Sequence, residues 1–170
     1  MIQINEITIR NNLNPGDIGY IIYLHGNSYK EEYNYGTEFE IYVASGLLEF
    51  YQQYDPRKDR IWICEHQHRI IGSLVLVHRK NNSAQLRFFL IEPAYRGLGL
   101  GKKLMELSME FFYQSHYQSC YLWTNDELGA AASLYKRHRF KLAAEKSSNA
   151  FGKKITEQRY DLLSAKNIRQ

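Results

Sequence analysis

The apolar positions of the chain follow two periods, and the period changes several times along its length. Residues 6–10 alternate as a short strand does, and the turn-forming residues 14–17 lead into a helix. Thr37 and Glu40 have the spacing of a capping box, and apolar residues then recur at helical spacing until Pro56. The first third of the chain is therefore predicted to hold one short strand and two helices.

The rest of the chain is richer in strand patterns. Pro93 ends the third of three successive strands, because proline lacks the amide hydrogen that a strand ladder needs. The predicted strands cover residues 60–65, 69–78, 83–92, 119–124, 141–144 and 155–162. One predicted helix follows the glycines near residue 100, and another covers residues 127–138. The order β-α-α-β-β-β-α-β-α-β-β predicts a mixed α/β fold around one sheet. No repeat or linker interrupts it, so residues 1–170 are expected to form a single domain.

Composition narrows the class of protein. The chain has 170 residues, 44% of them hydrophobic, and a formal net charge of only +4, so it can bury a core and is not a disordered chain. No stretch approaches the roughly 20 apolar residues of a membrane-spanning helix, so we expect a soluble, cytoplasmic protein that is not bound to a membrane. Cys64 alternates with His66 and His68, but no fourth ligand is evident and we predict no metal site.

The charge is unevenly divided along the chain. Residues 1–95 contain 9 Lys and Arg against 11 Asp and Glu, whereas residues 96–170 contain 13 against 7. The basic half would attract an anionic cofactor or a nucleic acid, and charge alone does not choose between them. Nucleic-acid binding would rest on this charge alone, so we do not predict a nucleic-acid partner.

Three glycines at alternate positions, Gly97, Gly99 and Gly101, lie between the third long strand and a helix. Each glycine costs backbone entropy on folding, so we expect the loop to have a backbone role beyond a tight connection. The free amides of the loop and of the first helical turn, together with Lys102 and Lys103, make a site for phosphate. A Walker loop and a dinucleotide-binding loop both need other glycine spacings, so ATP and NAD are not favoured.

The segment around these glycines resembles the GNAT superfamily of N-acyltransferases. Arg96, Gly99 and Gly101 match its pyrophosphate-binding signature, Gln/Arg-x-x-Gly-x-Gly/Ala, and Tyr135 and Phe140 match the end of its late helix. Three segments are similar to the acetyltransferase half of bifunctional MarR-type regulator/acetyltransferase proteins, namely 90–93, 122–124 and 156–162. Because the chain begins just before its first predicted strand, we expect no regulator domain and no DNA binding.

The resemblance implies a fold and a co-substrate. The fold is that of the GNAT acyltransferases, a mostly antiparallel central sheet with flanking helices and a splay between the fourth and fifth strands. Acetyl-CoA would lie in this splay, with its pantetheine arm against main chain and its pyrophosphate on the amides of the loop. The residues implied for acetyl-CoA are Phe89, Leu90, Ile91, Arg96, Gly97, Leu98, Gly99, Leu100, Gly101, Lys102, Lys103 and Asn125.

The resemblance also implies the reaction, in which a primary amine attacks the thioester directly and passes through a tetrahedral intermediate. Tyr135 is the implied general acid for the departing thiolate, because a tyrosine stays protonated at pH 7. Some family members carry a carboxylate where this chain has Gln85, which cannot accept a proton. Glu92 is therefore a candidate base, with Glu157, the acidic residues of 31–40 and a water chain as alternatives.

The N-terminal helices form one wall of the acceptor groove in this family. Tyr29, Tyr33, Tyr35 and Glu38 are therefore expected to contact the acceptor, either a small-molecule amine or a protein lysine or N-terminal amine. The same tyrosine-rich helices, or a late strand, are compatible with a homodimer. Because Gln85 replaces a carboxylate, the alternative is an acyl-CoA-binding sensor or interaction module that keeps the fold and lacks turnover.

Overall fold

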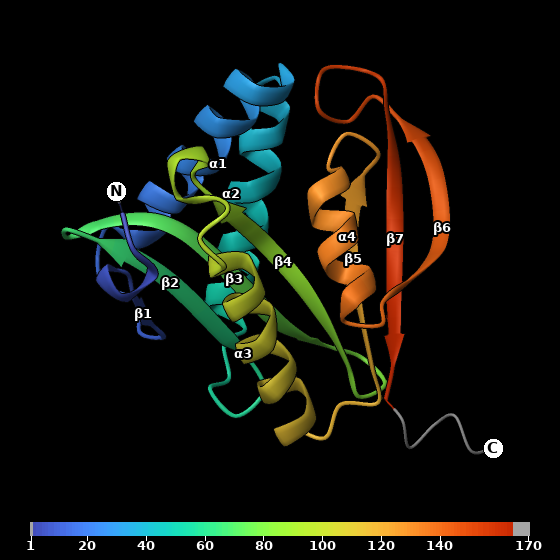
Figure 1. Cartoon of the computed structure of the whole chain (residues 1–170). Helices are drawn as coiled ribbons and strands as arrows, with labels where there is room; N and C mark the ends of the chain where they lie inside the picture. The colour runs from blue at the N-terminus through green and yellow to red at the C-terminus, as the bar shows by residue number, and fades with distance from the viewer. Residues whose placement is uncertain (1, 165–170) are drawn as a thin grey trace.

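The helices and strands of the protein are arranged around one sheet (Figure 1). A computed structural model describes residues 2–164. Its strands are β1 (Thr8–Arg10), β2 (Arg60–His66), β3 (Arg69–Arg79), β4 (Ser83–Ile91), β5 (Ser119–Asn125), β6 (Lys141–Ser148) and β7 (Ile155–Leu163). Its helices are α1 (Asp17–Tyr33), α2 (Thr37–Gln52), α3 (Leu100–Gln114) and α4 (Gly129–Arg137), with short 3-10 helices at Ile4–Glu6 and Pro93–Tyr95. This order confirms the predicted mixed α/β arrangement.

The sheet has the strand order β1-β2-β3-β4-β5-β7-β6. Neighbouring strands run antiparallel except for β4 and β5, which are parallel. The parallel pair is short, since its ladder runs only from Ser83 opposite Ser119 to Gln85 opposite Tyr121. Beyond Gln85 the two strands diverge (Figure 1), which confirms the predicted splay.

A bulge in β4 lies where the strands diverge. The register between β3 and β4 shifts between Ser73 and Val75, and Phe88 on β4 has a φ of 53°. A bulge inserts an extra residue and bends its strand, so residues that would alternate can face the same side. Arg87 and Phe88 both lie on the side of α2, where their atoms approach Gly46. The bulge therefore brings a charged and an aromatic side chain together at the opening.

Each face of the sheet is covered by two helices, α1 and α2 on one face and α3 and α4 on the other (Figure 1). The first pair packs through residues such as Val43 and Leu47 against Val75, and the second through residues such as Leu104 against Leu74. The opening between β4 and β5 is thus accessible to side chains from both cores. Within residues 2–164, no helix is long and apolar enough to cross a membrane.

Several details differ from the sequence predictions, three of them for a visible physical reason. The prediction of a capping box at Thr37 and Glu40 is wrong, because Gly36 is the N-cap of α2 and makes no side-chain cap hydrogen bond. α4 starts two residues later than predicted, because the amide of Glu127 donates to the Asn125 side chain in a turn before the helix. β6 extends to Ser148, since it pairs with β7 over its whole length.

Candidate active site

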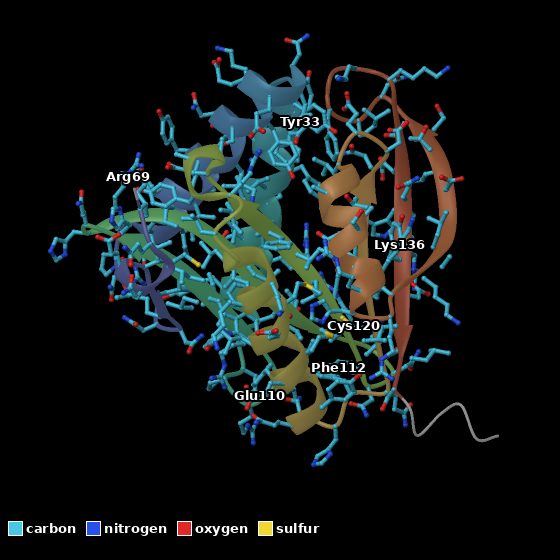
Figure 2. The ribbon with its side chains drawn as sticks, viewed as in Figure 1. Tyr33, Arg69, Glu110, Phe112, Cys120 and Lys136 are labelled. Atoms are coloured by element: carbon cyan, nitrogen blue, oxygen red, sulfur yellow. The ribbon has the colours of Figure 1, made fainter. Side chains whose placement is uncertain are left out.

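A cavity of about 390 Å³ lies where β4 and β5 diverge. Residues 85 and 87–91 of β4 and residues 123–124 of β5 line it, together with side chains from all four helices or their adjoining loops. Figure 2 shows Tyr33 near the end of α1, on the side that faces α4 and the β6–β7 loop. The cavity passes between the strands, so one half lies against α3 and α4 and the other against α1 and α2.

The glycine loop closes the α3 and α4 half. Gly97 has a φ of 79° and Gly99 a φ of 86°, conformations that side-chain-bearing residues adopt at a cost. Gly99 caps α3 without a side-chain hydrogen bond, and the first intrahelical bond there runs from the amide of Lys103 to its carbonyl. The amides ahead of Lys103 have no acceptor one turn earlier in the helix, so they are free for an anion.

The predicted acetyl-CoA residues divide into two groups. Those that line the cavity are Phe89, Leu90, Ile91, Arg96, Gly97 and Gly101. Leu98, Gly99, Leu100, Lys102 and Lys103 lie in the same loop and first helical turn but outside the cavity lining. The guanidinium of Arg96 donates to the carbonyl of Ile91 at 2.9 Å and to Glu32 at 2.7 Å, so it joins the end of β4 to α1.

Asn125 does not reach the cavity. It is buried, and its side-chain amide donates to the hydroxyl of Tyr35 at 2.6 Å. Its oxygen accepts the amide of Glu127 at 3.0 Å. These contacts tie the end of β5 to the connection between α1 and α2, which is a structural role.

The acceptor residues predicted on the N-terminal helices are also divided by the structure. Tyr29 and Tyr33 line the cavity, whereas Tyr35 is held in the core by Asn125. Glu38 is exposed, and its carboxylate folds back toward Gly36 instead of entering the cavity. The α1 and α2 wall is therefore mainly aromatic on its cavity side.

Tyr135 projects from α4 into the cavity between the two sheet halves. Its side chain is 6% exposed, and its ring centroid lies 6.2 Å from that of Phe89. Its hydroxyl makes no hydrogen bond among the described residues. Burial raises the pKa of this phenol well above its usual value of 10, so the group carries its proton throughout the neutral range. Its position and its protonation suit a proton donor.

The predicted base, Glu92, lies outside this cavity. Its carboxylate accepts a hydrogen bond from Arg69 at 2.8 Å, and the residue lines a separate pocket beside α1. Figure 2 shows Arg69 on the side of the molecule away from Lys136 of α4. Glu157 pairs with Lys146 on β6 at 3.3 Å. Neither carboxylate lines the cavity.

Gln85 has a structural role in the wall of the cavity. Its side-chain oxygen accepts hydrogen bonds from Arg79 at 2.9 Å and from the hydroxyl of Tyr121 at 3.2 Å. The side chain is buried at the last residue pair of the β4–β5 ladder. Gln85 thus fixes the point at which the strands separate.

Metal binding has no support among residues 2–164. No group of three His, Cys, Asp or Glu side chains is arranged there to hold an ion. Cys64 is buried, while His66 lies 3.0 Å from the hydroxyl of Tyr95. The alternating positions of these two residues in the sequence therefore do not produce a ligand cluster.

His25 is a cavity residue that the sequence analysis missed. Its ring is 2% exposed and lines the α1 and α2 half, where it lies at 84° to the ring of Phe88. Nδ1 donates to the carbonyl of Ile21 at 2.8 Å, and Nε2 has no hydrogen-bond partner among the described residues. Burial lowers the pKa of His25 to about 4, so the ring is neutral at pH 7 and Nε2 carries a free lone pair.

His25 predicts a pH dependence of stability. The unfolded chain accepts a proton below pH 6.5, whereas the folded protein resists protonation until about pH 4. The stability due to neutral His25 is therefore complete above pH 6.5 and is lost as the pH falls toward 4, at about 1.4 kcal/mol per pH unit. In urea denaturation at a series of pH values, His25→Gln should flatten this fall by about 2–3 kcal/mol. His68→Gln, which changes an exposed histidine, is the control, and equal slopes in the wild type and His25→Gln would contradict the prediction.

Comparison with known proteins identifies the family. Residues 57–142 match the family described as "Acetyltransferase (GNAT) domain". An uncharacterized N-acetyltransferase of Escherichia coli K12, YjgM, is 31% identical over 97 residues, which cover 55% of this chain and 58% of that protein. The chain thus aligns with little more than half of this relative's length.

Solved structures share the fold. An acetyltransferase from Streptococcus agalactiae 2603 superposes with a TM-score of 0.74 at 21% identity, covering 95% of this chain and 100% of that one. The spermidine N-acetyltransferase of Vibrio cholerae, in complex with CoA and spermine, gives 0.67 at 21% identity over 97% and 99%. The acetyltransferase yncA of Salmonella typhimurium, with acetyl-CoA, gives 0.72 at 15% identity over 92% and 93%. With the matched family segment, the splayed sheet and the glycine loop, these findings show that the chain belongs to the GNAT family of acetyltransferases.

Proposed function

We propose that this acetyltransferase moves the acetyl group of acetyl-CoA to a primary amine by direct attack, through a tetrahedral intermediate. The observation that carries the proposal is a single cavity that joins the glycine loop, Tyr135 and the aromatic wall of α1 and α2. Two substrates could therefore meet between β4 and β5 from opposite faces of the sheet. The spermidine acetyltransferase of similar fold supports a small-molecule amine as the acceptor.

The residues of the α3 and α4 half suit acetyl-CoA. Beyond Gln85 the main chain of β4 no longer pairs with β5, so residues 89–91 can offer it to a pantetheine arm. The amides of residues 98–102 would hold the pyrophosphate, because a helix N-terminus with positive-φ glycines favours a bound anion. Acetyl-CoA supplies the activated acyl group, and the protein orients it.

Proton transfers set the demands on the rest of the site. An alkyl ammonium with a pKa near 10.4 must lose a proton before it attacks, at a cost of about 4–5 kcal/mol at pH 7. Glu127 lines the cavity but binds Lys153 at 2.6 Å, and Glu92 lies outside the cavity. Water is therefore the proposed proton acceptor. Tyr135 is the proposed donor to the departing thiolate.

Release of CoA by the purified protein tests this function. Acetyl-CoA is offered with a panel of amino acids, polyamines, aminoglycosides and lysine peptides, and free thiol is measured. Acceptor-dependent turnover, with an acetylated amine detected by mass spectrometry, is expected. Thermal protection by acetyl-CoA is measured in parallel, and its absence together with absent turnover would contradict the proposal.

A second candidate function is an acyl-CoA-binding sensor. Gln85 favours it, because both hydrogen bonds to its side-chain oxygen are structural and it cannot accept a proton. A sensor would be protected by acetyl-CoA against thermal unfolding but would release no CoA with any acceptor. Turnover with a single acceptor excludes this alternative.

Gly99→Ala is predicted to weaken acetyl-CoA binding. A Cβ at φ 86° strains the backbone by about 1–2 kcal/mol and displaces the amides that start α3. Calorimetry should show about a 10-fold higher dissociation constant for acetyl-CoA. Gly16→Ala is the matched control, because Gly16 has a φ of 95° and caps α1 away from the cavity. Equal affinity in the two variants would contradict the role of the loop.

Other expectations from the sequence stay predictions. The similarity to the acetyltransferase half of MarR-type bifunctional proteins rests on three short segments. We also propose a single domain across residues 1–170, a cytoplasmic location, a homodimer, and a protein lysine or N-terminal amine as a further acceptor.

A further inference from the structure

The α1 and α2 half of the cavity holds a guanidinium with one distant counter-ion and an imidazole nitrogen without a partner among the described residues. One is the guanidinium of Arg87 on β4, and the other is Nε2 of His25 on α1. We propose that Arg87 binds a carboxylate of the acceptor and that the acceptor is an amino acid or a similar small amine carrying a carboxylate. This inference rests on the transferase function proposed above, because it names the substrate class of the same site.

Arg87 is largely buried in the cavity wall and makes few polar contacts. Its side chain is 10% exposed, and its guanidinium carbon lies 4.6 Å from the ring centroid of Phe88 and 5.2 Å from that of Tyr42. It has no side-chain hydrogen bond among the described residues. Its ion pair is with Glu49, whose nearer oxygen is 3.5 Å away. The aromatic rings hold the guanidinium in place and leave its N–H donors available.

Glu49 does not balance the charge of Arg87. The other oxygen of Glu49 accepts a hydrogen bond from Arg79 at 2.7 Å. Two guanidinium groups therefore share one carboxylate, and this wall of the cavity carries an excess positive charge. A cation withdrawn from most of its water is stabilised by a nearby anion, so a bound anion would be favoured here.

A carboxylate fits the shape of these donors. The guanidinium is a planar fork whose N–H groups match the two oxygens of a carboxylate in a bidentate pair. The bulge at Phe88 turns Arg87 to the side of α2, where an acceptor enters, and away from the α3 and α4 half. The anion that it binds therefore belongs to the acceptor and not to acetyl-CoA.

The amine of the acceptor finds a complementary group in His25. The free lone pair on Nε2 accepts an N–H hydrogen bond, and the rings of Tyr29 and Phe88 flank it. A neutral ring does not repel an amine. It also cannot keep the amine protonated as a carboxylate would, which suits a nucleophile that must attack in its neutral form.

The remaining charges of the cavity disfavour a polycation. Glu127 is neutralised by Lys153 at 2.6 Å, and Arg96 is neutralised by Glu32. Neither pair offers a free carboxylate to a second ammonium group. Arg87 would repel such a group, so a polyamine lacks a partner and meets a like charge.

Matched acceptors test the inference. The twenty L-amino acids, their amides and spermidine are compared as acceptors for the wild type, and kcat/KM is measured from CoA release. An amino acid should exceed its own amide by about 100-fold, the value expected for a bidentate charged pair. Arg87→Met keeps the packing of the stem and should reduce this ratio to about 1, while Arg87→Lys should give an intermediate ratio.

A second arginine controls for the general effect of charge. Arg159→Met removes a guanidinium stacked on Tyr121 at 4.4 Å, outside the cavity lining, and should keep the wild-type ratio. Acetyl-CoA should still protect Arg87→Met against thermal unfolding, which shows that the variant is folded and that its other half is intact. A preference for amides or spermidine, or an unchanged ratio in Arg87→Met, would overturn the inference.

Failure of the proposed function can be told apart from failure of this inference. If no acceptor is turned over, the amino acids and amides are titrated into the protein in the presence of CoA. Protection by an amino acid in the wild type, absent in Arg87→Met, would support the carboxylate site although the transferase proposal fails. No protection by any amino acid would overturn the carboxylate site as well.

Discussion

Tyr135→Phe is expected to lower kcat by about 100-fold or more, the usual contribution of a general acid. The phenol is buried in the cavity, and its raised pKa keeps the proton available for the departing thiolate. Removal of the hydroxyl leaves the ring beside Phe89, so packing is preserved. Acetyl-CoA affinity should change little, because the hydroxyl acts on the developing thiolate and not on the bound thioester. Steady-state CoA release and calorimetry together separate the two quantities.

Tyr160→Phe provides the control for this prediction. Tyr160 is a buried tyrosine whose ring lies 6.2 Å from that of Tyr135, and it does not line the cavity. It should retain its turnover. Because the pKa of Tyr135 is raised, its hydroxyl keeps its proton at pH 9–10. Titration of this residue should therefore cause no fall in the rate of the wild type over that pH range. A variant with wild-type kcat would show that solvent protonates the thiolate.

The glycine loop could be predicted from sequence because its requirement is local. Gly97 and Gly99 adopt positive φ values that glycine allows at little cost, and the chain spacing alone places them ahead of a helix. The order of helices and strands along the chain could also be predicted, since the periodicity of these segments is kept in the fold. The conformation of the loop and the order of elements along the chain therefore follow from short-range chemistry.

The acceptor half of the cavity could not be predicted in the same way. Arg87 faces α2 because of the bulge at Phe88, and no residue type in β4 predicts that bulge. The sequence indicates only that His25 is a polar residue on a helix. The tertiary packing is what buries its Nε2 without a partner among the described residues. The family resemblance implies that Asn125 lies near acetyl-CoA, but a hydrogen bond to Tyr35 holds it in the core. These outcomes depend on tertiary contacts between residues far apart in the chain.

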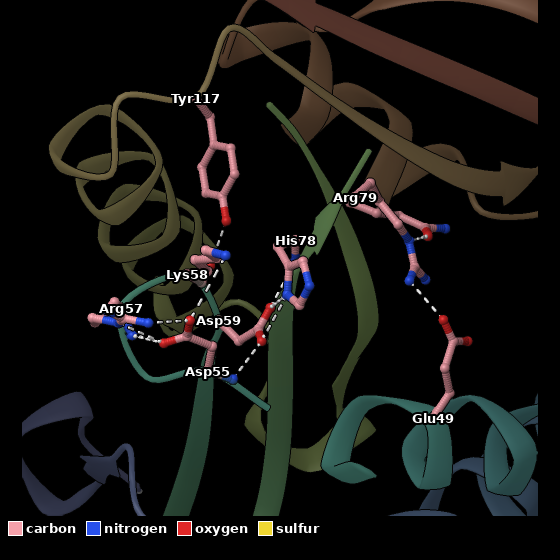
Figure 3. Close-up of polar contacts among 9 residues, drawn as sticks. Glu49, Asp55, Arg57, Lys58, Asp59, His78, Arg79 and Tyr117 are labelled. Carbon is pink, nitrogen blue, oxygen red and sulfur yellow. Dashed lines mark hydrogen bonds and ion pairs between the residues drawn. The ribbon is translucent and has the colours of Figure 1, made fainter. Parts of the chain in front are cut away.

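Asp59→Asn is expected to lower the free energy of unfolding by about 2–4 kcal/mol. Asp59 is 1% exposed at the start of β2, and its carboxylate accepts the amide of His78 at 2.6 Å and that of Asp55 at 2.8 Å (Figure 3). Nδ1 of His78 lies 2.9 Å from the same carboxylate. An asparagine of equal size would place an N–H₂ group against one of these donors. The loss should appear as a lower midpoint in urea denaturation with an unchanged slope.

Asp55→Asn separates burial from charge in this prediction. Asp55 lies four residues earlier in the same loop, and its carboxylate pairs with the exposed side chain of Arg57 at 3.0 Å (Figure 3). Solvent screens such a pair, so its loss should be much smaller than that of Asp59→Asn. If the two variants lose equal stability, the loop depends on its total charge. A larger loss for Asp59→Asn shows instead that a buried acceptor of backbone amides joins the end of α2 to β3, and thereby holds the α2 wall of the cavity against the sheet.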